Sequence, residues 1–155
     1  MSKKILATAA MALALVGCSK NKDPRPMNDF TFQGAYEEGS YEHFKQTAGD
    51  RVFFALASSH LSKDARAELD KQIEWLNKYP NTMFTVEGHA DERGTSEYNL
   101  ALGDRRAHAV RKYMMAKGLS KQRLSTVSFG KERPDVMGHN EAAWAKNRRA
   151  VTVVH

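Results

Sequence analysis

Apolar residues recur with two different spacings after residue 50, and the alternation predicts a fold of mixed helices and strands. Short runs rich in β-branched and aromatic side chains predict strands over residues 51–56, 83–87, 124–129 and 150–154. Apolar residues three or four positions apart predict helices over residues 63–79, 96–117 and 141–146. Strands that alternate with helices predict an α/β sandwich: a small mixed β-sheet of about four strands, two main helices packed on it, and a short third helix.

Residues that start and stop helices mark the ends of the two long ones. Ser62 and Thr95 are typical helix caps, while Pro80 and Gly118 are typical of a helix end. On the first helix, the side chains expected in the core are Ala65, Leu69, Ile73, Trp75 and Leu76. On the second, they are Tyr98, Leu102, Ala109, Val110, Tyr113 and Met114.

The first residues have the pattern of a bacterial secretion signal. Two lysines precede the apolar run Ile5–Val16, which is shorter than the roughly 20 residues that a membrane-spanning helix needs. The run leads into Leu-Val-Gly-Cys at positions 15–18, which resembles the lipobox of bacterial lipoproteins. We therefore expect residues 1–17 to be a signal peptide and Cys18 to carry acyl chains. Cys18 is the single cysteine of the chain, so an internal disulfide is excluded.

The segment after the lipidation site has the composition of a tether. Residues 18–48 begin with a polar stretch that contains Pro24 and Pro26, and they are expected to form the lipidated N-terminus and tether. Extended at about 3.3 Å per residue, such a tether would reach about 100 Å. Aromatic residues between positions 30 and 44 leave open whether part of it lies on the folded domain, which is expected over residues 49–155.

The residue after Cys18 indicates in which membrane the protein is anchored, and its charge indicates which partners it meets. Ser19, where an inner-membrane retention signal would have Asp, favours the periplasmic face of the outer membrane. The formal net charge of +6 falls to +4 once the two lysines of the signal are removed. Basic and acidic residues are interleaved, and an exported protein does not meet nucleic acid. The expected surroundings are anionic wall polymers and lipid head groups.

A charged loop between the second strand and the long helix is the main candidate site. Two glycines flank the loop, and Asp91 stands inside it. On the following helix, Asn99, Gly103 and Arg106 share one face. Ligands favour the carboxyl ends of strands and the N-termini of helices in such folds. A glycine inside a helix costs about 1 kcal/mol against alanine, so either a packed backbone or a ligand must approach Gly103 closely.

Asp91 and Arg106 allow two interpretations. An aspartate that accepts an ammonium and an arginine that grips a carboxylate would bracket a zwitterionic ligand. An ion pair between the two side chains, which would only stiffen the loop, explains the same residues equally well. The residue pattern by itself leaves both interpretations open.

Longer stretches carry a resemblance to a known family. Residues 85–95, 97–99 and 102–107 resemble the signature of the OmpA-like peptidoglycan-binding domain. Residues 127–134, 138–143 and 146–151 are similar to one branch of that family, the peptidoglycan-associated lipoproteins. Together with the lipobox, the resemblance covers most of the chain from residue 49 to residue 154.

The resemblance implies a binding protein without enzymatic activity or cofactor. It implies that the domain binds the diaminopimelate residue of the peptidoglycan stem peptide, with Asp91 and Arg106 as charged ligands. Asn99 and Leu102 would line the pocket. It also implies partners in the Tol system, above all the periplasmic β-propeller protein, and a role in outer-membrane constriction at cell division.

One position departs from the family pattern. The first strand of the family usually ends in aromatic-x-aromatic-Asp, and this tail contributes to the pocket. Here Leu56 and Ala57 stand at its last two positions, with Ala57 in place of the acid. If only a backbone N–H is used, Ala57 serves equally well. If the acidic side chain is needed, wall binding is weakened and the protein becomes mainly an interaction module for Tol proteins.

Other chemistries have less support. His89, Asp91 and Glu92 lack a further histidine at zinc-ligand spacing, so no metal site is expected. Asp91 with Glu92 or Asp104 could be a hydrolase's carboxylate pair, but no nucleophile accompanies them, which makes a wall-cleaving enzyme the least supported alternative. The Lys146–Arg149 run is expected to be a solvated cap on the last strand.

Overall fold

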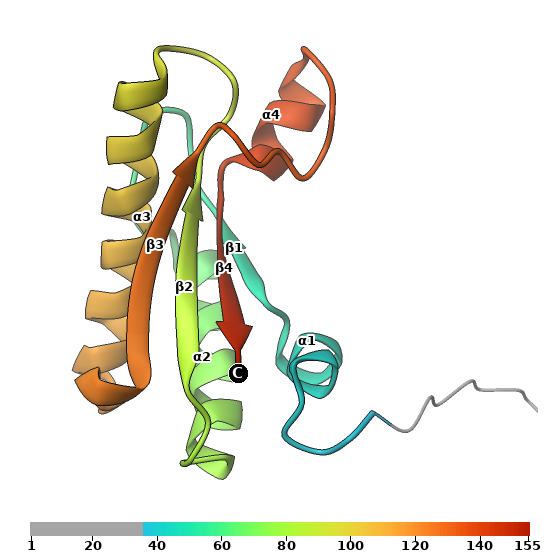
Figure 1. The fold of residues 1–155 in the computed structure, drawn as a ribbon, viewed down its shortest axis with the longest axis vertical. Coiled ribbons are helices and arrows are strands. Elements are labelled where there is room, and N and C mark those ends of the chain that lie inside the picture. Colours follow the sequence, from blue (N-terminus) through green and yellow to red (C-terminus); the bar gives the residue numbers. More distant parts are fainter. Residues whose placement is uncertain (1–35) are drawn as a thin grey trace, which may run out of the picture. The chain divides into compact units, whose positions relative to one another are not determined.

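A computed structural model describes residues 36–155, and the predictions for the signal peptide, Cys18 and the start of the tether lie outside these residues. The described chain contains a mixed sheet with the strand order β1-β4-β2-β3 (Figure 1). Its strands are β1 (Arg51–Phe53), β2 (Phe84–His89), β3 (Leu124–Gly130) and β4 (Arg149–Val154). The central strand β4 is antiparallel to both β1 and β2, while β2 and β3 are parallel.

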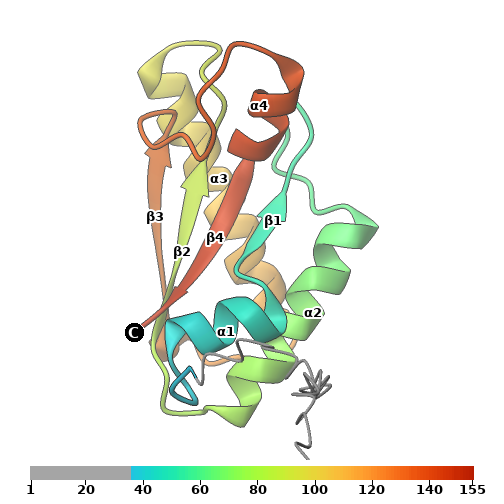
Figure 2. The ribbon, with the colours of Figure 1, turned by 90° about the vertical axis from the view of Figure 1, so that its right-hand side faces the viewer.

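The helices are arranged around this sheet in a way that confirms the predicted α/β sandwich. The two long helices, α2 (Lys63–Lys78) and α3 (Ser96–Ala116), pack on one face of the sheet (Figures 1 and 2). Two shorter ones, α1 (Tyr41–Ala48) and α4 (Glu141–Asn147), lie near opposite ends of the sheet (Figure 2). A 3₁₀ turn, η1 (Lys121–Arg123), leads into β3. No helix between residues 36 and 155 has the length and apolarity required to cross a membrane.

The predicted helix ends are confirmed by their hydrogen bonds. Ser62 Oγ accepts from the Ala65 N–H at 3.1 Å, and Thr95 Oγ1 accepts from the Tyr98 N–H at 3.2 Å. These caps satisfy backbone donors that the first turn of a helix leaves free. Gly118, with φ +100°, follows the last residues of α3 in the left-handed conformation that ends many helices.

The core lies between the sheet and the two long helices. It contains Leu69, Ile73, Trp75 and Leu76 from α2 and Leu102, Val110 and Met114 from α3, as predicted. Tyr98 was predicted to be buried, and this is wrong: 46% of its surface is exposed. It stands in the first turn of α3, beyond the part of the helix that covers the sheet, where helical spacing no longer implies burial.

Helix α1 was not predicted, and it lies within the segment expected to be tether. Ser40 caps it, and Phe44 is fully buried with its ring 5.0 Å from the ring of Trp75 on α2. Ala48, one turn further on, is also buried. The folded part of the chain therefore extends to the N-terminal side of Gly49.

A close contact between α3 and β2 explains the glycine inside α3. A Cβ atom on Gly103 would lie 2.8 Å from the carbonyl oxygen of Gly88, and one on Gly88 would collide with the carbonyl of Gly103. Of the two explanations that the sequence allowed for Gly103, the packed backbone is the one observed. The contact draws the start of α3 against the end of β2, and the charged loop connects these two ends.

Candidate functional site

Asp91 lies in the loop between β2 and α3 and is almost completely buried, at 5% exposure. Its Oδ1 accepts from the Arg93 N–H and Nε, both at 3.1 Å, and its Oδ2 accepts from Arg93 Nη2 at 2.7 Å. Arg148 Nη1 approaches the same Oδ2 at 3.5 Å. Burial acts to raise the pKa of Asp91, but the hydrogen bonds from Arg93 outweigh burial and hold the pKa below its usual value. The loop therefore presents a carboxylate that is ionised at neutral pH.

Arg106, from the middle of α3, has no exposed surface. Its guanidinium donates to three backbone carbonyls: Nε to Ser58 at 2.8 Å, Nη1 to His89 at 2.7 Å and Nη2 to Ala55 at 3.2 Å. Burial lowers the pKa of Arg106 to about 10, so the side chain still carries its charge at neutral pH. Arg106 thus connects the chain after β1 with the end of β2.

The ion pair between Asp91 and Arg106, which the sequence left open, is not formed in the described structure. Each side chain has other partners: Asp91 pairs with Arg93 and Arg148, and Arg106 donates to backbone carbonyls. The two residues nevertheless belong to one site. Asp91 follows two residues after His89, whose carbonyl accepts from Arg106.

The chain after β1 forms a turn where the sequence predicted more strand. β1 ends at Phe53, and the Ser58 N–H donates to the Ala55 carbonyl at 3.2 Å. Leu56 and Ala57 form the tip of this turn, and both are exposed. Ala57 has φ +50°, a left-handed conformation that Asp, Asn and Gly tolerate better than Ala. We call residues 55–58 the Ala57 turn.

Asn99 and Leu102 lie in the first turns of α3, and both are buried. Asn99 Nδ2 donates to the Arg93 carbonyl at 2.9 Å and so fastens the charged loop to the helix. Leu102, one turn further along α3, is 4% exposed. Of the two residues, Asn99 is the one that bonds to the loop.

Two arginines of the site were placed wrongly by the sequence analysis. Arg148 and Arg149 were expected on a solvated cap, but each is only 6% exposed. Arg148 donates to the Phe54 carbonyl at 3.1 Å and to Glu141 at 2.6 Å, besides its contact with Asp91. Buried arginines are rare unless they are paired. The Phe54 carbonyl and Asp91 come from distant segments of the chain, so the local run of charges could not show these partners of Arg148.

A second group of side chains, which the sequence did not single out, closes over the loop. The Arg93 guanidinium lies over the ring of Trp144 on α4, 4.1 Å from its centre. Glu92 accepts from Trp144 Nε1 at 2.7 Å and lies 2.7 Å from His139 Nδ1. These contacts hold α4 and the segment before it against the charged loop.

Two hollows border residues that neighbour or contact Asp91, although Asp91 itself is not among the lining residues of either. One has a volume of about 490 Å³, with Phe53, Ala55, Ser58 and Arg148 in its walls, and it borders the Ala57 turn. The other, of about 240 Å³, lies between Ala90, Glu92 and His139. No three carboxylate, histidine or cysteine side chains gather as a metal site within residues 36–155. The charged groups of this candidate site are Asp91, Arg93, Arg106 and Arg148.

Comparisons with known proteins identify the family of this chain. The sequence pattern of the OmpA family matches residues 53–148. The peptidoglycan-associated lipoprotein of Rhizobium meliloti (strain 1021) is 46% identical over 152 residues, which cover 97% of this chain and 86% of that protein. The protein of the same name from Haemophilus influenzae is 41% identical over 150 residues, covering 96% of this chain and 95% of the relative.

Solved structures show the same fold. The crystal structure of the peptidoglycan-associated lipoprotein from Burkholderia pseudomallei is 39% identical, with a TM-score of 0.68 over 72% of this chain and 96% of that one. The C-terminal domain of Helicobacter pylori MotB, at 22% identity, has a TM-score of 0.64 over 68% of this chain and 84% of that one, a likeness of fold alone. The chain therefore belongs to the OmpA family and, within it, to the peptidoglycan-associated lipoproteins.

Proposed function

We propose that this chain is an outer-membrane lipoprotein, anchored at the periplasmic face through acyl chains on Cys18, which binds peptidoglycan non-covalently. In this proposal the bound group is the diaminopimelate of the stem peptide, whose free end carries an ammonium and a carboxylate. As part of the Tol-Pal system, the protein ties the outer membrane to the wall and supports envelope integrity and constriction at cell division. The OmpA family consists of binding proteins rather than enzymes, so no wall cleavage is part of the proposal.

The observation that carries the proposal is the ionised, nearly buried carboxylate of Asp91 beside the buried cation Arg106. Arg93 now supplies the cation that Asp91 requires, and about a third of its side chain is exposed. An ammonium of the ligand could therefore replace Arg93 without leaving Asp91 unpaired. Such an exchange conserves the charge balance of the site, which keeps its cost low.

The ligand's carboxylate would lie towards the Ala57 turn. Arg106 holds this turn through two carbonyls and places its positive charge directly behind it. In this proposal the backbone of the exposed residues Leu56 and Ala57 supplies N–H donors to the ligand, Asn99 holds the loop through the Arg93 carbonyl, and Leu102 lines the pocket. A ligand with an ammonium for Asp91 and a carboxylate for the Ala57 turn would therefore bind better than a simple cation or a simple anion.

Competition for binding to purified sacculi tests this selection. The chain from residue 19 onward would be sedimented with sacculi in the presence of three soluble competitors. Free diaminopimelate should release the protein into the supernatant. Cadaverine, which keeps the two ammonium groups but has no carboxylate, and pimelate, which keeps the carboxylates but has no ammonium, should not. Equal release by diaminopimelate and cadaverine would rule out recognition of the carboxylate.

A second candidate function is favoured by Ala57 itself. If wall binding needs an acidic side chain at this position, the protein would act mainly as an interaction module for Tol proteins. Wild-type protein would then fail to sediment with sacculi, while an Ala57→Asp variant would sediment and both would still be captured by the immobilised β-propeller protein. Sedimentation of the wild type with sacculi excludes this alternative.

A further inference from the structure

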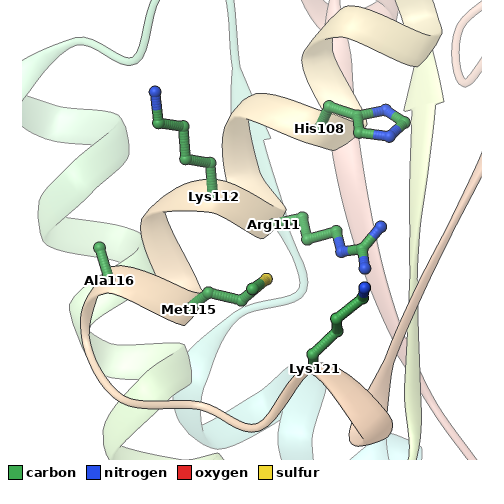
Figure 3. Close-up of a pocket in the computed structure, with 6 residues that line it drawn as sticks. All are labelled: His108, Arg111, Lys112, Met115, Ala116 and Lys121. Atoms are coloured by element: carbon green, nitrogen blue, oxygen red, sulfur yellow. The ribbon is translucent and has the colours of Figure 1, made fainter.

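A basic hollow lies on the C-terminal half of α3, far along the helix from the charged loop (Figure 3). Its volume is about 490 Å³, and it is lined by His108, Arg111, Lys112, Met115, Ala116 and, from η1, Lys121. Three of these six residues carry a permanent positive charge, and none carries a negative one. We call this group of residues the basic hollow.

The cations of the basic hollow have no acidic partner in the described chain. Among the lining residues only His108 has an acid close by, Asp104 at 3.3 Å, and the nearby Asp70 binds Lys117 at 2.9 Å; Arg111, Lys112 and Lys121 form no ion pair with residues 36–155. Arg111 and Lys121 instead extend towards the same space (Figure 3). Nε of Arg111 is buried and has no hydrogen-bond partner among residues 36–155. Two like charges that converge without a counter-ion repel each other, and an anion between them would remove this cost.

The hollow combines these charges with apolar surface. Met115, which is 38% exposed, and Ala116 form part of its wall. A phosphate group could accept hydrogen bonds from Arg111 and Lys121, while the carbon atoms next to it contact Met115. This combination fits the head group of a phospholipid better than it fits a fully polar wall glycan.

The position of the basic hollow points to the same partner. α3 runs along the sheet for about 30 Å at 1.5 Å per residue, with the charged loop at its start and the hollow near its end. Helix α1, which leads from the N-terminal part of the chain into the domain, lies at the same end of the sheet as η1, whereas α4 lies at the other end (Figure 1). The end of the domain that receives the chain is therefore also the end that carries the unpaired cations.

We propose that the basic hollow binds the phosphate head group of an anionic phospholipid at the membrane surface. Arg111 and Lys121 hold the phosphate, and Lys112 adds positive charge at the rim. Basic side chains near an anionic membrane each strengthen attachment, and a basic patch commonly supplements acyl chains. The hollow would turn the opposite end of the domain, with Asp91, away from the membrane. This inference does not depend on what Asp91 binds.

Vesicle sedimentation of the chain from residue 19 onward tests the inference, because this chain lacks acyl groups and retains every described contact. Wild-type protein should sediment with phosphatidylcholine vesicles that contain phosphatidylglycerol, and not with phosphatidylcholine alone. Arg111→Ala with Lys121→Ala should weaken this binding by about twenty-five-fold, at about five-fold for each cation removed. The control double variant, Lys63→Ala with Arg105→Ala, removes two exposed charges outside the hollow and should bind as the wild type does.

Three outcomes would overturn the inference. Equal sedimentation of the wild-type protein with phosphatidylcholine vesicles and with vesicles that also contain phosphatidylglycerol would exclude an anionic-lipid site. Equal losses in both double variants would show that net charge, not the hollow, governs binding. Loss of sedimentation with sacculi in the Arg111/Lys121 variant, with vesicle binding intact, would assign the hollow to the wall polymer. Lys63, Arg105 and Lys121 are exposed and Arg111 is partly buried, so circular dichroism is used to verify that each variant is folded.

Discussion

At the scale of single residues, Ala57 is held in a conformation that its side chain does not favour. Its φ of +50° lies in the left-handed region, where a residue with a Cβ atom loses roughly 1–2 kcal/mol. The Ala57 turn persists because Arg106 binds the carbonyls of Ala55 and Ser58 on either side of it. Asp or Asn suits the same backbone better.

Replacing Ala57 by Asn should therefore stabilise the protein. Asn adopts the left-handed region more readily than Ala does, and we expect the free energy of unfolding in urea to rise by about 0.5–1 kcal/mol. The matched control is Ala101→Asn, at an exposed helical position of α3, where Asn should be slightly destabilising. A loss of stability in the Ala57 variant would mean that the turn is not strained at this residue.

His89 supplies a pH-dependent part of the stability. Its ring is buried against Phe129, and neither ring nitrogen has a hydrogen-bond partner among the described residues. Burial, followed by the charges of Arg149 and Arg133, lowers the pKa of His89 from 6.5 to about 4. Between these two pH values the unfolded chain binds a proton that the folded chain does not, so stability falls as the pH falls through this window.

Substitution of His89 by Leu should remove this dependence. Between pH 7 and pH 4 the wild type should lose about 3 kcal/mol more unfolding free energy than the His89→Leu variant loses. The exposed His108, replaced by Gln, serves as the control and should follow the wild-type curve. Parallel curves for the wild type and His89→Leu would show that His89 is protonated equally in both states.

The sequence predicted most of the residues of the site but few of the contacts between them. Asp91, Asn99 and Arg106 were identified from loop position, helical spacing and resemblance, and all lie around the same loop in the structure. The contacts of Arg148 with Asp91 and of Trp144 with Arg93 were missed, because each joins segments that only the folded chain brings together. Arg93 was also missed as a partner of Asp91, although it lies only two residues further along the chain. For the same reason, the run that contains Arg148 and Arg149 was wrongly predicted to be solvated.

At the scale of elements, the contact between α3 and β2 determines where the charged loop lies. Gly88 and Gly103 allow the two backbones to approach each other, and Ser128 on β3 donates to the Leu100 carbonyl of α3 at 2.7 Å. Because the loop joins β2 to α3, any separation of these elements would also displace Asp91.

Gly103→Ala should therefore destabilise the domain. The new Cβ would lie 2.8 Å from the Gly88 carbonyl oxygen, and overpacking of this kind costs about 1–3 kcal/mol. Urea unfolding of Gly103→Ala and of its exposed neighbour Asp104→Ala measures the difference, and the second variant should remain close to the wild type. Equal stability of both variants would show that the backbones are further apart than described.

A substitution in helix α1 tests whether the folded domain begins before Gly49. Phe44→Ala removes a fully buried ring that packs on Trp75 and should cost about 3–5 kcal/mol. Lys45→Ala, at the exposed neighbouring position, should cost little. If the unfolding of Phe44→Ala matches that of the wild type, α1 contributes nothing to the domain and belongs to the tether.

The elements themselves were largely predictable. The four strands and the helices α2, α3 and α4 follow apolar spacing and capping residues, and all are present in the structure. Helix α1 was missed because it spans only eight residues and buries just Phe44 and Ala48, too few positions to establish a helical period. The first strand was predicted too long, since the apolar residues after Phe53 form the Ala57 turn.

At the scale of the whole molecule, the two proposed sites of the described domain lie at opposite ends of α3. The charged loop with Asp91 precedes the helix, and the basic hollow with Arg111 lies near its end. Together with acyl chains on Cys18, this polarity would suit a protein that holds two layers of the envelope together. The central proposal is that Asp91 binds the diaminopimelate of the peptidoglycan wall.

Binding of Asp91→Asn to purified sacculi tests this claim most directly. The substitution keeps the shape of the side chain and removes its charge, and the dissociation constant should rise by about thirty-fold or more, as for a broken buried charge pair. Asp104→Asn removes an exposed charge from α3 and should leave binding unchanged. A folded Asp91→Asn variant that binds sacculi as tightly as the wild type would contradict the account.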